Sequence, residues 1–212
     1  MLSKWFAVFL LGISLVSAPA QAEAAGQERV LVEKHLFPLL KDADRVVIYS
    51  LYPFSKEDLE KEPDAMELRT AFQLAPGEAA TLSERQKAVA ELARKADTVE
   101  GIPILGQVEL KKAKEIEDLL SATRSAMRTW EELPEEGDCH YPRHGLLVEK
   151  GGVKFFFSIC LECGNTLLKG APAEASKAVE AFHHFDRKFQ ENLNARLDAK
   201  GIPRFPYAKS PE

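Results

Sequence analysis

The stretch CHYPRHGLLVEKGGVKFFFSICLEC, residues 139–163, decides the fold expected for this chain. Two largely apolar runs, 145–150 and 153–161, flank the pair Gly151-Gly152. Adjacent glycines suit a two-residue turn that needs positive φ, so the stretch predicts a β-hairpin. Pairing symmetric about the two glycines places one strongly apolar set on a single face: His144, Leu146, Val148, Phe155, Phe157 and Ile159. On the other face Arg143 is expected directly opposite Cys160.

The rest of the chain alternates helical and extended patterns around this hairpin. Helices are expected over 27–41, 83–100, 111–130 and 174–199, and strands over 46–52, 104–110 and 164–168. A hairpin joins antiparallel strands, so the sheet is expected to be mainly antiparallel. The pattern predicts an α+β fold with two layers, a mainly antiparallel sheet with packed helices.

The N-terminus is typical of a secretory signal peptide. One lysine, Lys4, precedes an apolar run from Trp5 to Val16, and Ala20-Gln21-Ala22 forms an Ala-x-Ala cleavage site. An uncleaved anchor is the alternative, but the run is shorter than the roughly 20 residues that span a bilayer. The expected organisation is a signal peptide over 1–22, a single α+β domain over 23–203 and a mobile tail over 204–212. We therefore expect an exported protein, periplasmic or secreted, with no membrane span.

The composition is that of an ordinary globular chain. It has 212 residues, 45% of them hydrophobic and 29% charged, with 12 Gly and 12 Pro. These values exclude collagen-like, low-complexity and wholly disordered classes. The formal charge of −5 disfavours a nucleic-acid partner, because such proteins carry basic surfaces toward phosphates.

The segments Cys139-His140-Tyr141-Pro142-Arg143-His144-Gly145 and Ile159-Cys160-Leu161-Glu162-Cys163 carry a resemblance. They are similar to a group of exported bacterial proteins that share Cys, two variable residues, Pro-Arg-His-Gly, a hairpin, then Ile-Cys-aromatic-x-Cys. Leu161 stands where that group usually has an aromatic residue. The resemblance covers about half of the chain after the signal peptide. It implies a shared fold, and it implies no activity.

Three cysteines converge on the open end of the predicted hairpin, and a disulfide is the first interpretation. Exported proteins retain disulfides, which leaves one of the three cysteines over. The register brings Cys163 next to Cys139, so a Cys139–Cys163 bridge is favoured, with Cys139–Cys160 as the variant pairing.

A metal site is the second interpretation. Cys160-x-x-Cys163 has the spacing of a zinc knuckle, and Cys139 with His144 or His140 could complete a tetrahedral set. The alternative metal ligands are therefore Cys139, His144, Cys160 and Cys163, and zinc is the cofactor expected in that case. For His144 alone, a core-facing imidazole bonded to backbone is the simpler interpretation.

Thiol redox chemistry by Cys160 and Cys163 is the third interpretation. Arg143 opposite Cys160 would favour the thiolate and lower its pKa. Redox Cys-x-x-Cys pairs normally lie at a strand-to-helix turn, whereas this pair precedes Gly164-Asn165, with no helix predicted for several residues.

No nucleophile elbow, P-loop, dinucleotide-binding glycine pattern or His-Glu-x-x-His sequence occurs in the chain. The expected function is therefore a non-enzymatic binding or structural module with a cysteine-stabilised hairpin and an unknown protein or small ligand as partner. The alternative is a zinc-binding or thiol-redox protein that uses the cysteine–histidine cluster. The sequence leaves open whether the chain is an enzyme.

Overall fold

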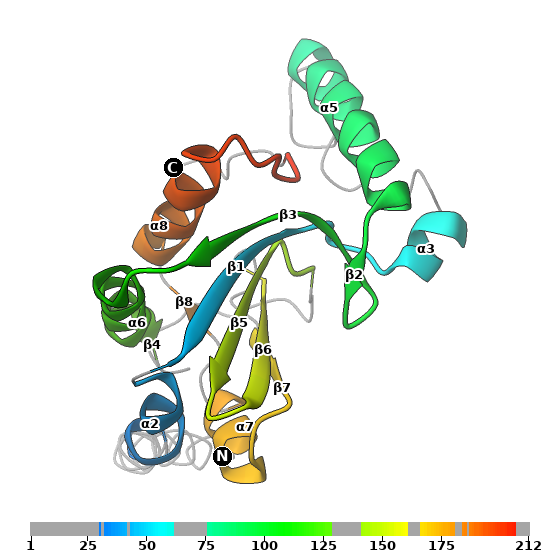
Figure 1. Cartoon of the computed structure of the whole chain (residues 1–212). Helices are drawn as coiled ribbons and strands as arrows, with labels where there is room; N and C mark the ends of the chain where they lie inside the picture. Colours follow the sequence, from blue (N-terminus) through cyan, green and yellow to red (C-terminus); the bar gives the residue numbers. More distant parts are fainter. Residues whose placement is uncertain are drawn as a thin grey trace, which may run out of the picture.

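A six-stranded antiparallel sheet forms the centre of the molecule, in the order β2-β3-β1-β5-β6-β7 (Figure 1). The computed structural model describes residues 30, 32–41, 43–61, 76–128, 141–160, 166–180, 184–185 and 187–206. The strands are β1 Arg45–Leu51, β2 Thr98–Val99, β3 Ile102–Leu110, β5 His144–Lys150, β6 Val153–Ile159 and β7 Thr166–Lys169. Helices lie against this sheet, so the predicted α+β fold is confirmed.

The predicted hairpin is present with the predicted register. Every pair from Lys150↔Val153 to His144↔Ile159 is symmetric about the two-glycine turn. Gly151 and Gly152 have φ of 57° and 80°, the left-handed region that glycine enters without steric cost. The apolar face assigned from the sequence is therefore the face that the protein buries.

Strand β1 lies between β3 and β5, and its residues from Val46 to Leu51 are all buried. A strand that is buried on both faces has a continuous hydrophobic sequence, and Val46-Val47-Ile48 fits that rule. Ser50 is the polar exception, and it lies in register with His144.

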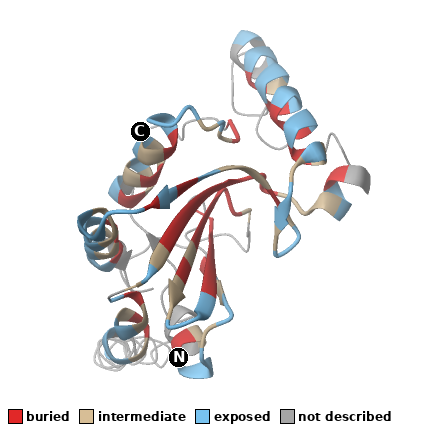
Figure 2. Cartoon of the chain, in the orientation of Figure 1, coloured by how far each residue is buried: buried red, intermediate tan, exposed pale blue. Residues whose placement is uncertain are grey.

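One face of the sheet is covered by helices, which form the second layer (Figures 1 and 2). The main core lies between these helices and the sheet. The helices contribute Leu36, Leu40, Leu119, Phe189 and Leu193 to it. The helices of this layer are η1 Val32–Leu36, a π-helical turn, α2 Phe37–Leu40, α6 Ala113–Ala126, α7 Ala173–Glu180 and α8 Arg187–Asp198. No helix within the described ranges is long and apolar enough to cross a membrane.

The sheet curls so that its opposite face encloses a second core. Val47, Tyr49, Leu51 and Phe156 pack there with residues of the β2–β3 hairpin. Lys169 Nζ of β7 forms an ion pair with Glu100 Oε2 of the β2–β3 turn, 3.2 Å away. This pair connects the two edges of the curled sheet. Both groups are about half exposed, so burial of the apolar face stabilises the curl more than this pair does.

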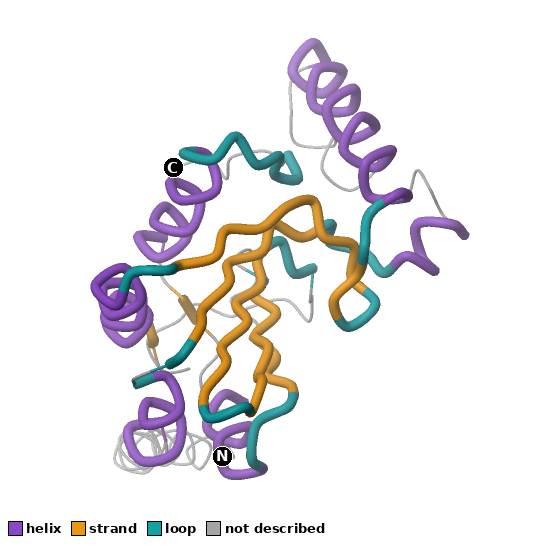
Figure 3. The backbone as a smooth tube through the Cα atoms, in the orientation of Figure 1, coloured by secondary structure: helices purple, strands orange, loops and turns teal. Residues whose placement is uncertain are grey.

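A third core lies at the end of the sheet where β1 finishes. Tyr52 and Phe205 pack there against α5, which spans Pro76–Lys95, and α3, which spans Lys56–Lys61. Residues 201–206 leave α8 as a loop and run above β3 toward this core (Figure 3). Phe205 is only 2% exposed, while residues 207–212 lie outside the described ranges.

The prediction of a single helix over 174–199 is wrong. Two helices, α7 and α8, replace it, and between them β8, His184–Phe185, pairs with β4, Met127–Arg128. The sequence 182–185 is Phe-His-His-Phe, and aromatic and histidine residues favour helices less than leucine or alanine. Tertiary strand pairing therefore overrides the helical spacing of the phenylalanines.

Candidate functional site

Polar side chains gather, buried, at the end of the sheet where β1 and β6 end and β5 and β7 begin. We call this group the polar end. The exposed fractions of its members are 0% for Ser50, 7% for Arg143, 3% for His144, 0% for Cys160 and 2% for Thr166. Buried polar groups require hydrogen-bond partners, so apolar packing alone does not explain why these polar side chains are buried together.

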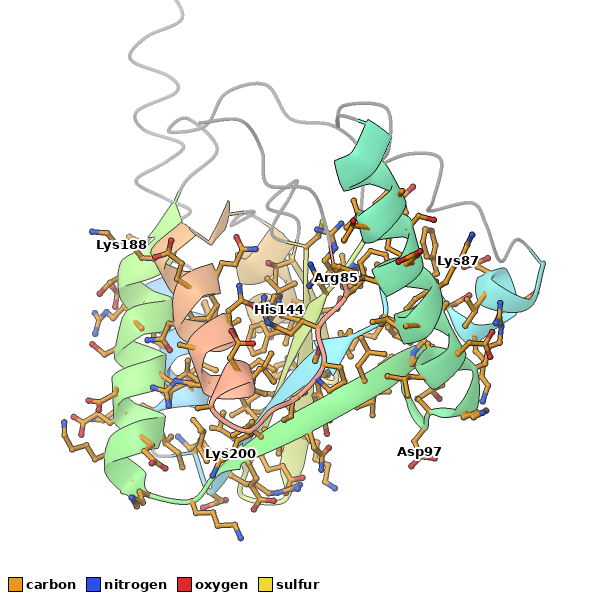
Figure 4. All side chains as sticks on the ribbon, turned by 90° about the horizontal axis from the view of Figure 1, so that it is seen from above. Arg85, Lys87, Asp97, His144, Lys188 and Lys200 are labelled. Atoms are coloured by element: carbon orange, nitrogen blue, oxygen red, sulfur yellow. The ribbon has the colours of Figure 1, made fainter. Side chains whose placement is uncertain are left out.

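His144 lies on the helix-covered face, in register with Ser50 of β1 and Ile159 of β6. Its Nε2 lies 2.9 Å from Oδ1 of Asn194 on α8, and Figure 4 shows the ring beside that helix. With the amide oxygen as acceptor, Nε2 carries the proton and Nδ1 presents a lone pair. Nδ1 is buried and has no hydrogen-bond partner within the described residues.

The imidazole of His144 is neutral at physiological pH. Its pKa is lowered to about 4: burial is the largest cause and the positive charges of Arg204 and Arg143 add to it, while the hydrogen bond to Asn194 opposes them. A neutral ring whose Nε2 is anchored offers an acceptor or a metal-binding nitrogen at Nδ1, and it cannot serve as an acid.

Arg143 lies at the junction between the hairpin and the aromatic core around α5. Its backbone N–H donates to Ile159 O at 3.2 Å, and its carbonyl accepts from Leu51 N–H at 2.9 Å. The guanidinium carbon lies 5.5 Å from the centroid of the Phe205 ring, which makes an edge contact with Tyr52. This cation–π contact fixes the guanidinium at the polar end.

The β5–β6 ladder stops at the His144↔Ile159 pair. Arg143 N–H bonds to Ile159 rather than to Cys160, so the symmetric register does not continue past His144. Cys160, predicted opposite Arg143, follows directly after β6 as a fully buried thiol. Since successive residues of a strand alternate faces, Cys160 leaves the strand on the face away from His144.

The segment after α8 is fixed to the sheet beside His144. Ser50 Oγ donates a hydrogen bond to Pro203 O at 2.7 Å. Gly106 permits the close approach, because a Cβ there would lie 2.6 Å from Cγ2 of Ile202. Arg204 binds both oxygens of Asp198 at 2.8 and 2.9 Å, which orders the segment over the end of α8.

Thr166, the first residue of β7, completes the row across the sheet. It is in register with Ile159, so it shares the face of His144. Its Oγ1 is buried and makes no hydrogen bond to any part of the chain that the structure describes. Two strand spacings separate it from His144, about 10 Å across the sheet.

Cys139, His140 and Cys163 lie outside the described residues, so the disulfide, zinc and redox interpretations stay predictions. In the described ranges, no group of three or more His, Cys, Asp or Glu side chains is arranged to hold a metal ion. His144 faces the core as predicted, although its hydrogen bond is to the Asn194 side chain rather than to backbone.

Sequence reasoning missed Asn194 and Thr166. Asn194 lies inside α8, next to the fully buried Leu193. The one signal for its role is that asparagine is unusual in the interior of a helix. Thr166 begins the short strand β7, which is not part of the hairpin, so the hairpin pattern does not predict where Thr166 lies. Its position in the row depends on tertiary pairing alone.

Comparisons with known proteins yield no relative: no family model, no curated protein and no solved structure matches this chain. The buried polar groups at the polar end are therefore the basis on which a function can be assigned.

Proposed function

We propose that this chain is an exported binding module whose polar end receives a small polar ligand. The supporting observation is that two buried acceptor atoms of one row, His144 Nδ1 and Thr166 Oγ1, have no partner within the described residues. The signal-peptide pattern at Met1–Ala22 supports export.

Unpaired buried polar atoms support a binding role because they destabilise the ligand-free fold. Each one costs about 1–3 kcal/mol, since water no longer solvates it and nothing replaces the water. Such a cost is typical of sites at which a ligand supplies the missing hydrogen bond. A ligand that donates to His144 Nδ1 and also reaches Thr166 must be longer than a single ion.

The surroundings of this row are fixed before a ligand binds. His144 is held by Asn194, Ser50 by Pro203, and Arg143 by the backbone of Leu51 and Ile159. A site whose side chains are already ordered loses less conformational entropy on binding, which raises affinity.

Zinc binding is the second candidate, and the anchoring of His144 favours it. Metal-binding histidines usually donate the other ring N–H to an oxygen acceptor, as Nε2 does to Asn194 Oδ1. Cys160 leaves β6 on the face away from His144, so in this candidate Nδ1 binds the metal together with thiolates from Cys139 and Cys163, without the Cys160 ligand expected from the sequence. Thr166 has no role in it, which separates the two candidates.

Replacing Thr166 with valine is expected to stabilise the ligand-free protein by about 1 kcal/mol, because the substitution removes an unpaired buried hydroxyl while keeping the shape. Thr123→Val is the matched control. Thr123 is equally buried, but its Oγ1 donates to Leu119 O at 2.8 Å, so this variant is expected to lose about 1 kcal/mol. Urea unfolding of both variants measures the two free energies. Destabilisation by Thr166→Val would show that Oγ1 has a structural partner and would remove half of the proposed site.

A further inference from the structure

The segment 201–206, which follows α8, lies next to the polar end, and we call it the strap. The carbonyl oxygen of Pro203 accepts the hydrogen bond from Ser50 Oγ at 2.7 Å. Ser50 lies directly opposite His144 on the neighbouring strand, and residues paired in this way share one face of the sheet. Figure 4 shows the strap running from Lys200 past the labelled His144. The strap therefore lies beside the buried imidazole.

The far end of the strap is anchored in the aromatic core. Phe205 is buried, and its ring makes an edge contact with Tyr52, with 5.3 Å between the ring centroids. The guanidinium carbon of Arg143 lies 5.5 Å from the centroid of the same ring. The strap thus contacts both Ser50 and Arg143 of the polar end and passes next to His144.

The strap can leave the sheet without breaking any strand pairing. Its residues Pro203 and Pro206 have no N–H to donate, so they cannot extend a ladder of backbone hydrogen bonds. The N–H of Ile202 bonds back to Leu197 O of α8 at 3.1 Å. Within the described ranges, no backbone–backbone hydrogen bond joins the strap to a strand of the sheet. The strands, in contrast, are held by continuous ladders.

Two glycines set where the strap turns and how closely it approaches. Gly201 has a φ of 64°, and a Cβ at this position would meet no atom within 4 Å, so packing does not restrain rotation there. At Gly106 of β3, a Cβ would lie 2.6 Å from Cγ2 of Ile202. Closure of the strap therefore depends on the absence of a side chain at position 106.

We propose that the strap is a gate, which turns about Gly201 and must open before a molecule can reach the imidazole of His144. The ring is buried, so access to it requires a movement, and the strap is the neighbouring segment that no ladder holds. The gate closes when Phe205 returns to the aromatic core and Pro203 returns to Ser50. That the entering molecule is a ligand rests on the proposed function, whereas the opening itself does not.

A disulfide between positions 106 and 202 tests the gate. A Cβ at position 106 would lie 3.5 Å from Cβ of Ile202, a separation that a disulfide spans. In the full chain, Gly106→Cys with Ile202→Cys should therefore lock the strap when oxidised and release it when reduced. The probe is diethyl pyrocarbonate, which acylates neutral imidazole, and peptide mass spectrometry gives the rate at each histidine. His35, on η1, is the internal control.

We expect His144 to react about ten-fold more slowly in the oxidised variant than in the reduced one, because modification requires local opening. His35 should react at the same rate in both states. Wild-type protein taken through the same oxidation and reduction controls for its own cysteines. Equal rates at His144 in the oxidised and reduced variant would overturn the gate.

A wedge at Gly106 tests the gate in the opposite direction. Gly106→Ala places a methyl group against Ile202, so the strap should open more often and His144 should react several-fold faster than in the wild type. Gly106→Ala with Ile202→Ala removes the clash and should slow the reaction again. Circular dichroism checks that both variants are folded. A wedge variant that reacts at the wild-type rate would contradict the gate.

These rates are measured without a ligand, so the gate and the proposed function can fail separately. Rates that follow the strap, in a protein that carries no bound molecule, would overturn the proposed function alone. A bound molecule together with rates that ignore the disulfide would overturn the gate alone.

Discussion

Replacing Leu193 with alanine is expected to lower the free energy of unfolding by about 3 kcal/mol, with an upper limit near 5 kcal/mol. Leu193 of α8 has no exposed surface and belongs to the main core between the helices and the sheet. Truncation removes buried apolar surface and leaves a cavity that neighbouring strands cannot fill.

Leu92→Ala is the matched control for this prediction. Leu92 is the same residue type, also within a helix, but it is 51% exposed. Its truncation should change the free energy of unfolding by less than about 0.5 kcal/mol. Chemical denaturation measures both values. Equal effects of the two substitutions would mean that α8 does not cover the sheet.

Acidification from pH 6.5 to 4 is expected to remove about 3 kcal/mol of stability through His144 alone. The pKa of His144 is lowered from 6.5 to about 4 in the folded protein, because burial disfavours the charged ring. The unfolded chain therefore binds a proton at higher pH than the folded chain does. The contribution of this histidine is complete above pH 6.5, falls as the pH drops below that value, and is lost below pH 4. Each pH unit of pKa difference corresponds to about 1.4 kcal/mol.

The difference in unfolding free energy between the wild type and His144→Gln isolates this effect. Carboxylates such as Glu149, whose pKa is lowered by ion pairs with Lys154 and Arg45, titrate in both proteins and cancel. The advantage of the wild type should shrink steadily between pH 6.5 and 4. A difference that stays constant over this range would show that the ring is solvated.

The hairpin could be predicted in detail because local chemistry determines it. The adjacent glycines fix the turn, and alternation then fixes which residues face the core, so the pairs Leu146↔Phe157 and Leu147↔Phe156 can be deduced from the sequence. Strand β1 and helix α6 could also be predicted, because β1 is a continuous run of strand-forming residues and α6 has helical periodicity.

The break between α7 and α8 could not be predicted in the same way. Phe182, Phe185 and Phe189 have helical spacing in the sequence, and only pairing with Met127–Arg128, far away in the sequence, makes His184–Phe185 extended. The curl of the sheet is likewise a tertiary result, since nothing near Lys169 indicates that Glu100 lies beside it.

The candidate site was predictable in part. The motif points to Arg143, His144 and Cys160, and all three lie buried at one end of the sheet. Its other half comes from distant elements: Ser50 on β1, Thr166 on β7 and Asn194 on α8. The pattern of the motif contains no information about which helix packs on the hairpin.

Native mass spectrometry of the protein purified from an exporting host tests the central claim most directly. The proposal predicts a chain that begins at Glu23 and carries one small organic molecule. Denaturation should release that molecule, and the combined variant His144→Gln with Thr166→Val should lack it. A bare chain from the wild type would contradict the proposal, and a single zinc ion in place of an organic mass would replace it with the metal site.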